Sequence, residues 1–337
     1  MLIKDIYGKL WKPLPEPMQK YPKYLQNKFP MPNQETKIGI EIEAEGWIGF
    51  DCDPLIRDMI SSMWSGKNEP SLRDNGIEFV SLPVQGNQIS VALSLLEVLN
   101  NVGHLHYTDL AGLHVHLNVR DFLQSQFANL AMLYLVFEES LYRISGNRKR
   151  NIYCLPARSC WSGLPRLFTT KNLTLALRYA NKYMGFNYLT IKQFGTVEFR
   201  HSKGSRDVSY IHHWICTLMR MHTAAQMWDT TALQEKIFQL NTNSEYWAFT
   251  KEIFQEDSDW IDNVNLKSEM EEGVTLLKEW FIEPHLTSDK ILDTAERPKT
   301  RPNKIPNKVL GGINVNVDLA DFVLKVPEGL QPINVRR

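Results

Sequence analysis

Apolar and polar residues alternate along two stretches of the chain, residues 37–47 and 113–119. Because a strand points successive side chains to opposite faces, this period of two predicts strands with one buried face. Residues 76–83 form a third short apolar stretch that ends at Pro83, and we expect a strand there too. The polar side of the two alternating stretches carries Glu41, Glu43, Glu45, His114, His116 and Asn118.

Other stretches repeat apolar residues at the spacing of an amphipathic helix. They are residues 87–102, 121–145, 171–183, 208–227 and, with scattered aromatic residues, 232–283. Asp121 stands where it could cap the second of these helices. Residues 187–200 are predicted to form a hairpin that turns near residues 193–195.

Strands with one polar face, separated by helices, predict an α+β fold. Its sheet would be antiparallel or mixed and curved, with helices packed on one face and a polar concave face left open. Composition divides the chain into four segments. They are a proline-rich N-terminal arm at residues 1–35, a core at 36–230, a helical extension at 231–284, and a proline- and lysine-rich loop with a C-terminal segment at 285–337.

The composition is that of a chain that can bury a sizeable core. Of its residues 43% are hydrophobic and 11% aromatic, and 38 basic residues balance 38 acidic ones, so a nucleic-acid partner is not indicated. We see no apolar stretch of signal-peptide length at the N-terminus. The longest apolar run, residues 130–137, is shorter than the roughly 20 residues of a membrane span. None of the four cysteines forms a C-x-x-C pair, so we expect reduced thiols in a cytoplasmic protein.

Glu41 and Glu43 stand two residues apart on one predicted strand. Both carboxylates are therefore expected on the same face, with Cβ atoms about 6.6 Å apart. Carboxylates at that spacing can each bind one of two hard divalent cations about 3.5–4 Å apart. A solvated polar strand face is the alternative interpretation, and it applies to Glu45 as well.

His114 and His116 repeat this spacing on another predicted strand. Imidazoles that project together can bind a metal ion or a phosphate oxygen. A cupin also uses an H-x-H strand, but it requires a glutamate four or five residues later, where this chain has Arg120 and Asp121. Paired polar positions that bind nothing are the alternative.

Two further motifs place charged residues on otherwise apolar strands. Glu78 lies within EFVSLP, and Glu198 and Arg200 lie within TVEFR. A carboxylate for a cation beside an arginine for phosphate is what a metal–nucleotide site needs, while a salt bridge between strands is the alternative. The chain has neither a Walker A motif nor a G-x-G-x-x-G motif, which excludes a P-loop or Rossmann nucleotide site.

The order of these motifs resembles that of the amidoligases, which belong to the glutamine synthetase and glutamate–cysteine ligase superfamily of carboxylate–amine ligases. The motifs are GIEIE (39–43), EFVSLP (78–83), GLHVH (112–116), NRKRNIYC (147–154) and TVEFR (196–200). The resemblance implies a fold like the glutamine synthetase catalytic domain, with residues 36–230 as the catalytic core. Such proteins are frequent in phage and bacterial accessory gene sets.

The resemblance implies metal-binding roles for five residues. Glu41, His114 and Glu198 would bind the metal ion nearer the transferred phosphate. Glu43 and Glu78 would bind a second ion. The ions implied are Mg²⁺ or Mn²⁺, two or more of them.

Other matching residues would contact ATP. His116 would touch the nucleotide phosphates, Arg200 would stabilise the transferring phosphoryl group, and Asn187 would have a positioning role. Arg148 or Arg150 would supply a further phosphate or carboxylate contact, and their spacing does not choose between them. Together with the metal ligands Glu41 and Glu198, Arg200 makes the predicted catalytic set.

The function implied is ATP-dependent ligation of a carboxylate to an amine through an acyl phosphate. The partners would be a small-molecule or peptide carboxylate and an amine acceptor, whose identities the sequence leaves open, as it leaves open a homo-oligomeric state. Two alternatives remain at this point. One is a phosphotransferase like the phosphagen kinases on the same fold, and the other is a non-catalytic accessory protein that retains the fold.

Overall fold

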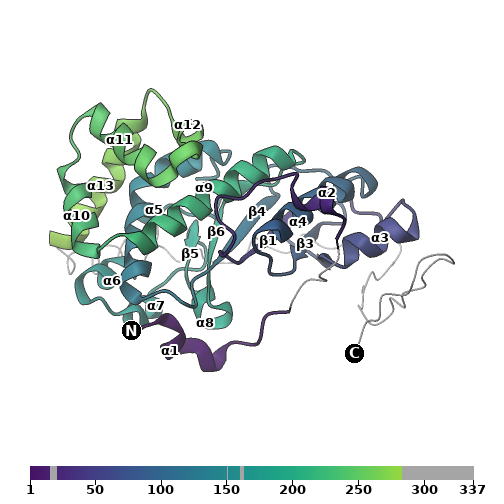
Figure 1. Cartoon of the computed structure of the whole chain (residues 1–337), viewed down its shortest axis with the longest axis horizontal. Coiled ribbons are helices and arrows are strands. Elements are labelled where there is room, and N and C mark those ends of the chain that lie inside the picture. The colour runs from purple at the N-terminus through teal and green to yellow at the C-terminus, as the bar shows by residue number, and fades with distance from the viewer. Residues whose placement is uncertain (16–20, 150, 160–162, 283–337) are drawn as a thin grey trace.

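The protein is described by a computed structural model that covers residues 1–15, 21–149, 151–159 and 163–282 (Figure 1). Its centre is a six-stranded sheet in the order β2-β3-β1-β4-β6-β5, with every neighbouring pair antiparallel. The strands are β1 (Ile38–Ala44), β2 (Trp64–Asn68), β3 (Ile77–Ser81), β4 (Gly112–Asn118), β5 (Phe186–Asn187) and β6 (Thr196–Lys203). The predicted α+β class is confirmed, and the sheet is antiparallel rather than mixed. Its likeness to glutamine synthetase stays a prediction.

One face of the sheet is apolar because of the period-two pattern in its strands. Ile38, Ile40 and Ile42 of β1 are at most 1% exposed, and they point to the same side as Val115 and Phe199 of the neighbouring strands. Burying this face supplies the main driving force for placing helices against it.

Three long helices cover the apolar face, as Figure 1 shows for α9 crossing β4. They are α4 (Asn87–Val102), α5 (Gln124–Ile144) and α9 (Val208–Met227). The Tyr134 ring of α5 lies 4.6 Å from the Phe186 ring and 6.3 Å from the Phe199 ring, so this helix packs directly on β5 and β6. The helices therefore leave the opposite, polar face of the sheet for a site.

A second helical layer packs outside the first. It contains α10 (Thr230–Gln239), α11 (Asn243–Phe254), α12 (Ser258–Ile261) and α13 (Leu266–Ile282). Helix α13 lies against α5, where a Cβ at Gly273 would be only 1.9 Å from the Leu135 carbonyl oxygen. This close approach requires glycine at position 273. The predicted helical extension therefore packs on the core through the contact between α13 and α5.

The N-terminal residues lie along the body of the protein. Leu2 bridges to Leu123, Ile3 is fully buried, and the Trp11 indole donates a hydrogen bond to the Ile191 carbonyl at 2.8 Å.

The short helices are α1 (Ile3–Tyr7), α2 (Lys23–Gln26), α3 (Pro54–Ser61), α6 (Leu164–Thr170), α7 (Leu173–Arg178) and α8 (Thr190–Phe194), with 3₁₀ turns at Gly8–Leu10, Ala157–Ser159 and Gln255–Asp257.

Several predicted elements differ from those in the structure. Helices α4 and α9 match the prediction, but α5 begins at Gln124, and Asp121 forms an ion pair with Lys4 at 2.8 Å instead of capping it. The predicted helix at 171–183 is reduced to α7. The predicted hairpin pairs β5 with β6, yet the short helix α8 connects them. Strand β2 and helix α3 were not predicted.

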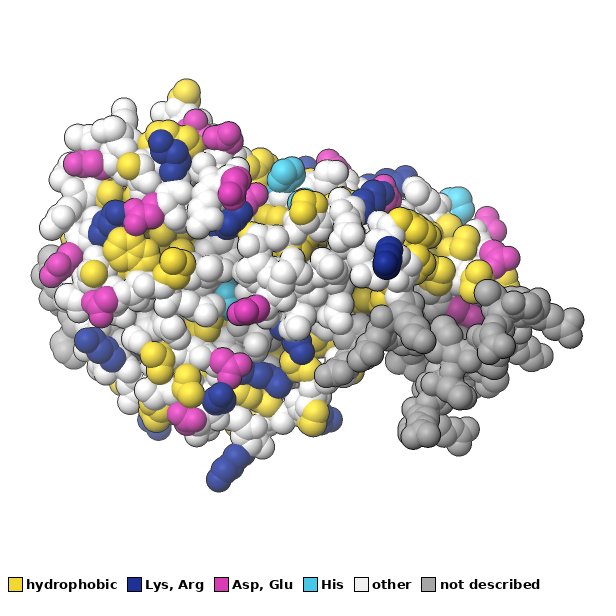
Figure 2. Space-filling model, in the orientation of Figure 1, with side chains coloured by type: hydrophobic (Ala, Val, Ile, Leu, Met, Phe, Trp, Pro, Cys, Tyr) yellow, Lys and Arg dark blue, Asp and Glu magenta, His cyan; other side chains and the backbone are white. Residues whose placement is uncertain are grey.

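The face of the protein seen in Figure 2 carries acidic and basic side chains interspersed over its described part, as the balanced composition suggests. Among the helices of the described residues, none combines the length and the apolar character needed to cross a membrane. Two predictions, the role of Arg150 and the loop and C-terminal segment at 285–337, lie outside the described residues.

Candidate active site

The register of the strands brings the predicted site residues together on the polar face. The directly opposed pairs are Glu41–His114, Glu43–Glu78, His116–Glu198 and Asn187–Glu198. Opposed residues of an antiparallel pair point to the same face with Cβ atoms about 4.5–5.5 Å apart. Four motifs that lie far apart in the chain therefore form one cluster at the centre of the sheet.

Glu41 occupies the middle of this cluster, between two imidazoles. Its carboxylate oxygens lie 3.5 Å from His114 Nδ1 and 3.4 Å from His116 Nε2. Burial alone would raise the pKa of Glu41, but the two imidazoles outweigh burial and hold the pKa below its usual value. The pKa of His116 is raised, because the attraction of Glu41 and Glu198 exceeds the effect of burial. Glu41 is therefore ionised at neutral pH.

Both imidazoles present a nitrogen that has no hydrogen-bond partner among the described residues. These atoms are His114 Nδ1 and His116 Nε2, and both are buried. The other nitrogen of His116 lies 3.0 Å from the Thr196 hydroxyl, which fixes the ring so that Nε2 faces Glu41. Each of these nitrogens lies 3.4–3.5 Å from a carboxylate oxygen, which is longer than a good hydrogen bond, so a ligand between them would fit here.

Glu198 is held from two sides. Asn187 donates a hydrogen bond to Glu198 Oε2 at 2.7 Å, and Arg200 donates one to Oε1. Burial would raise the pKa of Glu198, but Arg200 and the two histidines lower it below its usual value. The Arg200 Nε also donates to the Tyr153 carbonyl at 3.0 Å. Arg200 and Glu198 belong to the same strand, so their ion pair lies within β6 and does not connect two strands.

Glu43 and Arg148 meet at Gly112. The Gly112 amide donates to Glu43 Oε2 at 2.6 Å, and a Cβ at Gly112 would lie 2.6 Å from Arg148 Nη1 and 2.9 Å from His114 Nε2. A side chain at position 112 would therefore collide with the groups that converge there. Arg148 is buried and donates to the carbonyls of Ser202 and Leu110, which lowers its mobility beside the site.

The edge strand β2 adds two residues that the sequence analysis missed. Lys67 lies opposite Glu78, and its ammonium forms an ion pair with Glu78 Oε2. Glu69 comes directly after the strand, and its carboxylate lies close to those of Glu43 and Glu78. Lys67 and Glu69 show the same i, i+2 spacing as Glu41 and Glu43, which is the signal that could have revealed them.

Three groups of side chains in this cluster could hold a metal ion, each with ligand atoms within 4.8 Å of one another. They are Glu41–His116–Glu198, Glu41–Glu78–His114 and Glu43–Glu69–Glu78. Carboxylate oxygens suit Mg²⁺ or Mn²⁺, and the imidazole in two of the groups favours a transition-metal ion such as Mn²⁺ over Mg²⁺. All five residues predicted as metal ligands belong to these groups. His116, predicted to touch phosphate, also offers its nitrogen to one of them.

The polar face is more enclosed than the predicted open face. Glu43, Glu78, His114 and Glu198 are all buried, because they pack against one another across the strands. Glu45, for which a solvated position was the alternative interpretation, is 4% exposed and accepts a hydrogen bond from the Arg73 amide at 2.9 Å.

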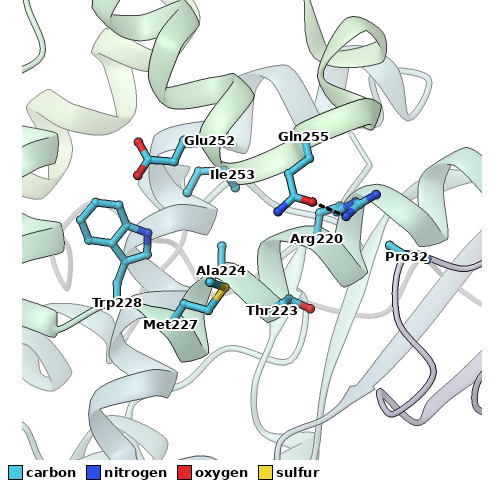
Figure 3. Close-up of a pocket in the computed structure, with 9 residues that line it drawn as sticks. All are labelled: Pro32, Arg220, Thr223, Ala224, Met227, Trp228, Glu252, Ile253 and Gln255. Atoms are coloured by element: carbon cyan, nitrogen blue, oxygen red, sulfur yellow. Dashed lines mark hydrogen bonds between the residues drawn. The ribbon is translucent and has the colours of Figure 1, made fainter.

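A separate pocket lies between α9 and α11, as Figure 3 shows. Arg220 points into it, but the guanidinium already bonds Gln255, Glu256 and Asp257. The pocket contains none of the predicted site residues and belongs to the helical layers. The polar face of the sheet is therefore the candidate active site.

Residues 58–221 match the model of a family described as "putative amidoligase enzyme". The match confirms the resemblance to the amidoligases that the motifs predicted, and it indicates a ligase. The motifs from EFVSLP to TVEFR lie inside the matched range, whereas GIEIE precedes it. Strand β1, which carries GIEIE, nevertheless lies between β3 and β4 of the matched range. A search of curated proteins finds no match to the chain.

Proposed function

We propose that the protein is an ATP-dependent ligase that joins a carboxylate to an amine through an acyl phosphate. The observation that carries the proposal is the polar face of the sheet, where four strands bring carboxylates and imidazoles into groups suited to divalent cations. Two guanidinium groups, of Arg148 and Arg200, lie at the side of these groups. This combination of acidic ligands and arginines suits a nucleotide bound through its phosphates.

The chemistry requires activation of the carboxylate, because oxide or hydroxide is a poor leaving group in water. A carboxylate oxygen attacks the γ-phosphorus of ATP, which releases ADP and forms an acyl phosphate. The amine then attacks the carbonyl carbon, the C–O bond to phosphate breaks, and the amine loses a proton. Phosphate leaves, and an amide remains.

The residues of the polar face divide this work. Mg²⁺ or Mn²⁺ would be held by the five predicted metal ligands, Glu41, Glu43, Glu78, His114 and Glu198. When bound, these ions would neutralise part of the negative charge of the phosphates. Arg200, whose Nε is fixed by the Tyr153 carbonyl, would pair with the transferring phosphoryl group. Asn187 orients Glu198, and Arg148 offers a positive charge near Glu43. His116, whose Nε2 lies 3.4 Å from Glu41, would contact the nucleotide phosphates.

A coupled assay tests this proposal. The purified protein is incubated with ATP, Mg²⁺ and a panel of amino acids, peptides and amines, and ADP release is followed together with the mass of the products. A ligase releases ADP only when a carboxylate and an amine are both present, and the product is heavier than the carboxylate by the amine less water. ADP release with the amine alone and a phosphorylated amine would identify a kinase instead. No nucleotide binding in any condition would support the accessory-protein alternative.

A further inference from the structure

Lys67 occupies a distinctive position at the edge of the polar face. It lies on β2, the edge strand, directly opposite Glu78. Its ammonium forms an ion pair with Glu78 Oε2, yet the Lys67 side chain is 60% exposed while that of Glu78 is 6% exposed. The lysine is therefore free to move away into solvent, whereas the carboxylate is fixed in the sheet.

The carboxylate that Lys67 neutralises also belongs to a group that could hold a divalent cation. Ligand atoms of Glu43, Glu69 and Glu78 lie within 4.8 Å of one another. Glu78 Oε2 is buried, and its close partner among the described residues is the Lys67 ammonium, so the charge of this oxygen is balanced from the exposed edge of the sheet. An ammonium and a divalent cation at this oxygen repel each other, so each opposes the binding of the other.

We propose that Lys67 is an internal counter-ion for the outer carboxylate group Glu43–Glu69–Glu78, and that a divalent cation binds there only by displacing its ammonium. The inference rests on the proposed function, which supplies the divalent cations. Without metal, Lys67 offsets part of the repulsion among the three carboxylates. When the metal binds, the doubly charged ion replaces the singly charged ammonium, and the Lys67 side chain moves from the edge of the sheet into solvent. The outer group should therefore bind its ion more weakly than Glu41–His116–Glu198, the group that does not include Glu78.

Binding of Mn²⁺ to the nucleotide-free protein tests this competition. Free Mn²⁺ is measured by electron paramagnetic resonance during a titration of the wild type and of Lys67→Met. Removing the ammonium should tighten the weakest Mn²⁺ site by about tenfold or more, because a charge a few ångströms away no longer opposes the ion. Lys28→Met is the matched control, since Lys28 is 46% exposed and pairs with Glu97 on α4. It should leave the isotherm unchanged.

A double variant shows which group of carboxylates accounts for the tighter Mn²⁺ binding. Adding Glu69→Gln to Lys67→Met should remove the tightened binding, because Glu69 belongs to the outer group. The Glu69 carboxylate accepts a hydrogen bond from the Ser71 amide at 3.0 Å, which the amide oxygen of glutamine can still accept. Melting curves establish that each variant is folded, and Lys67→Gln replaces Lys67→Met if the methionine variant fails to fold.

The outcomes separate this inference from the proposed function. Equal Mn²⁺ isotherms for the wild type and Lys67→Met would overturn the role of Lys67 and leave the metal sites intact. A gain that survives Glu69→Gln would also overturn it, since the tightened site would not be the outer group. Absence of Mn²⁺ binding in every variant would overturn the inference and the proposed metal sites together.

Discussion

At the scale of single residues, the unpartnered nitrogens of His114 and His116 are the most informative feature of the polar face. A buried polar atom without any partner costs about 1–3 kcal/mol, and the ion-pair contacts of 3.4–3.5 Å to Glu41 and Glu198 offset only part of this cost. A bound cation or phosphate would satisfy both nitrogens. The cost in the free protein is then recovered when the ligand binds.

A substitution of Arg200 tests the proposed chemistry of the polar face. Arg200→Lys should keep the fold and the affinity for ATP, because a positive charge remains beside Glu198. It should cut turnover by about 10³-fold, since lysine cannot present the same fork to a transferring phosphoryl group. Single-turnover ADP formation and a melting curve measure the two effects. A destabilised Arg200→Lys that still works at the full rate per folded molecule would show that Arg200 is a structural partner of Glu198.

Glu138 makes a pH-dependent contribution to stability away from the polar face. This carboxylate lies inside α5, where it accepts hydrogen bonds from Tyr134 and from the Ala157 amide. Burial raises its pKa from 4.5 to about 7. Between these values the folded protein keeps a proton that the unfolded chain has lost, so this group makes stability fall as the pH rises from about 4.5 to about 7.

Glu138→Gln should remove this dependence, because glutamine accepts the same hydrogen bonds and does not ionise. The variant should gain stability relative to the wild type by up to roughly 3 kcal/mol between pH 5 and pH 8, at 1.36 kcal/mol per pKa unit. Chemical denaturation of both proteins at pH 5, 6, 7 and 8 measures the difference. A gap that does not change with pH would mean that Glu138 has an ordinary pKa in the folded protein.

At the scale of elements, each central strand separates a structural face from a site face. Two adjacent residues of β3 illustrate the two faces. Phe79 is buried among apolar side chains, whereas Glu78 points to the other carboxylates of the polar face. The Phe79 ring lies 5.1 Å from that of Trp47 in an edge-on contact. Glu43 is less suited to such a comparison, because it also accepts the Gly112 amide and so has a structural role.

Substitutions on β3 should therefore separate stability from activity. Phe79→Ala should cost about 3–5 kcal/mol through the lost burial and the cavity. Glu78→Gln should cost little in chelator, or stabilise the protein, because burial and the nearby charge of Glu41 already raise the pKa of Glu78. The same Glu78→Gln should lose metal-dependent ATP turnover. Melting curves in chelator beside a turnover assay measure both, and a large loss of stability in Glu78→Gln would make this glutamate structural.

At the scale of the whole molecule, the helices occupy the apolar face of the sheet and the ligand groups occupy the other. We therefore expect a ligand to bind on the polar face without rearrangement of the helical layers. Binding should therefore stabilise the folded protein by simple linkage, in proportion to the logarithm of the ligand concentration.

ATP with Mg²⁺ should raise the melting temperature of the protein. At 100 times the dissociation constant the stabilisation is about 2.7 kcal/mol, which corresponds to a shift of roughly 5 °C in a protein of this size. ATP in chelator should give little or no shift, because the carboxylates then repel the phosphates. Equal shifts with and without the metal ion, measured by differential scanning fluorimetry, would contradict a nucleotide site built on cations.

The local pattern of the sequence determined much of the fold. Alternation assigned one apolar and one polar face to β1 and β4, and helical spacing gave the bounds of α4 and α9. These features depend on neighbours within a few residues, so they can be predicted without the rest of the chain. The same alternation identified the metal-competent residues, since ligands and core residues occupy opposite positions of the same strands.

Tertiary structure alone decided how these pieces meet. A period of two determines which side chains of a strand share a face, but it does not determine how that strand pairs with its neighbours. That Glu41 lies opposite His114, and His116 opposite Glu198, follows only from the pairing of the strands in the sheet. The partner of Asp121 is Lys4, more than a hundred residues away, which no local capping rule could supply. Lys67 and Glu69 join the site for the same reason, because an edge strand acquires its neighbours when distant segments of the chain pair.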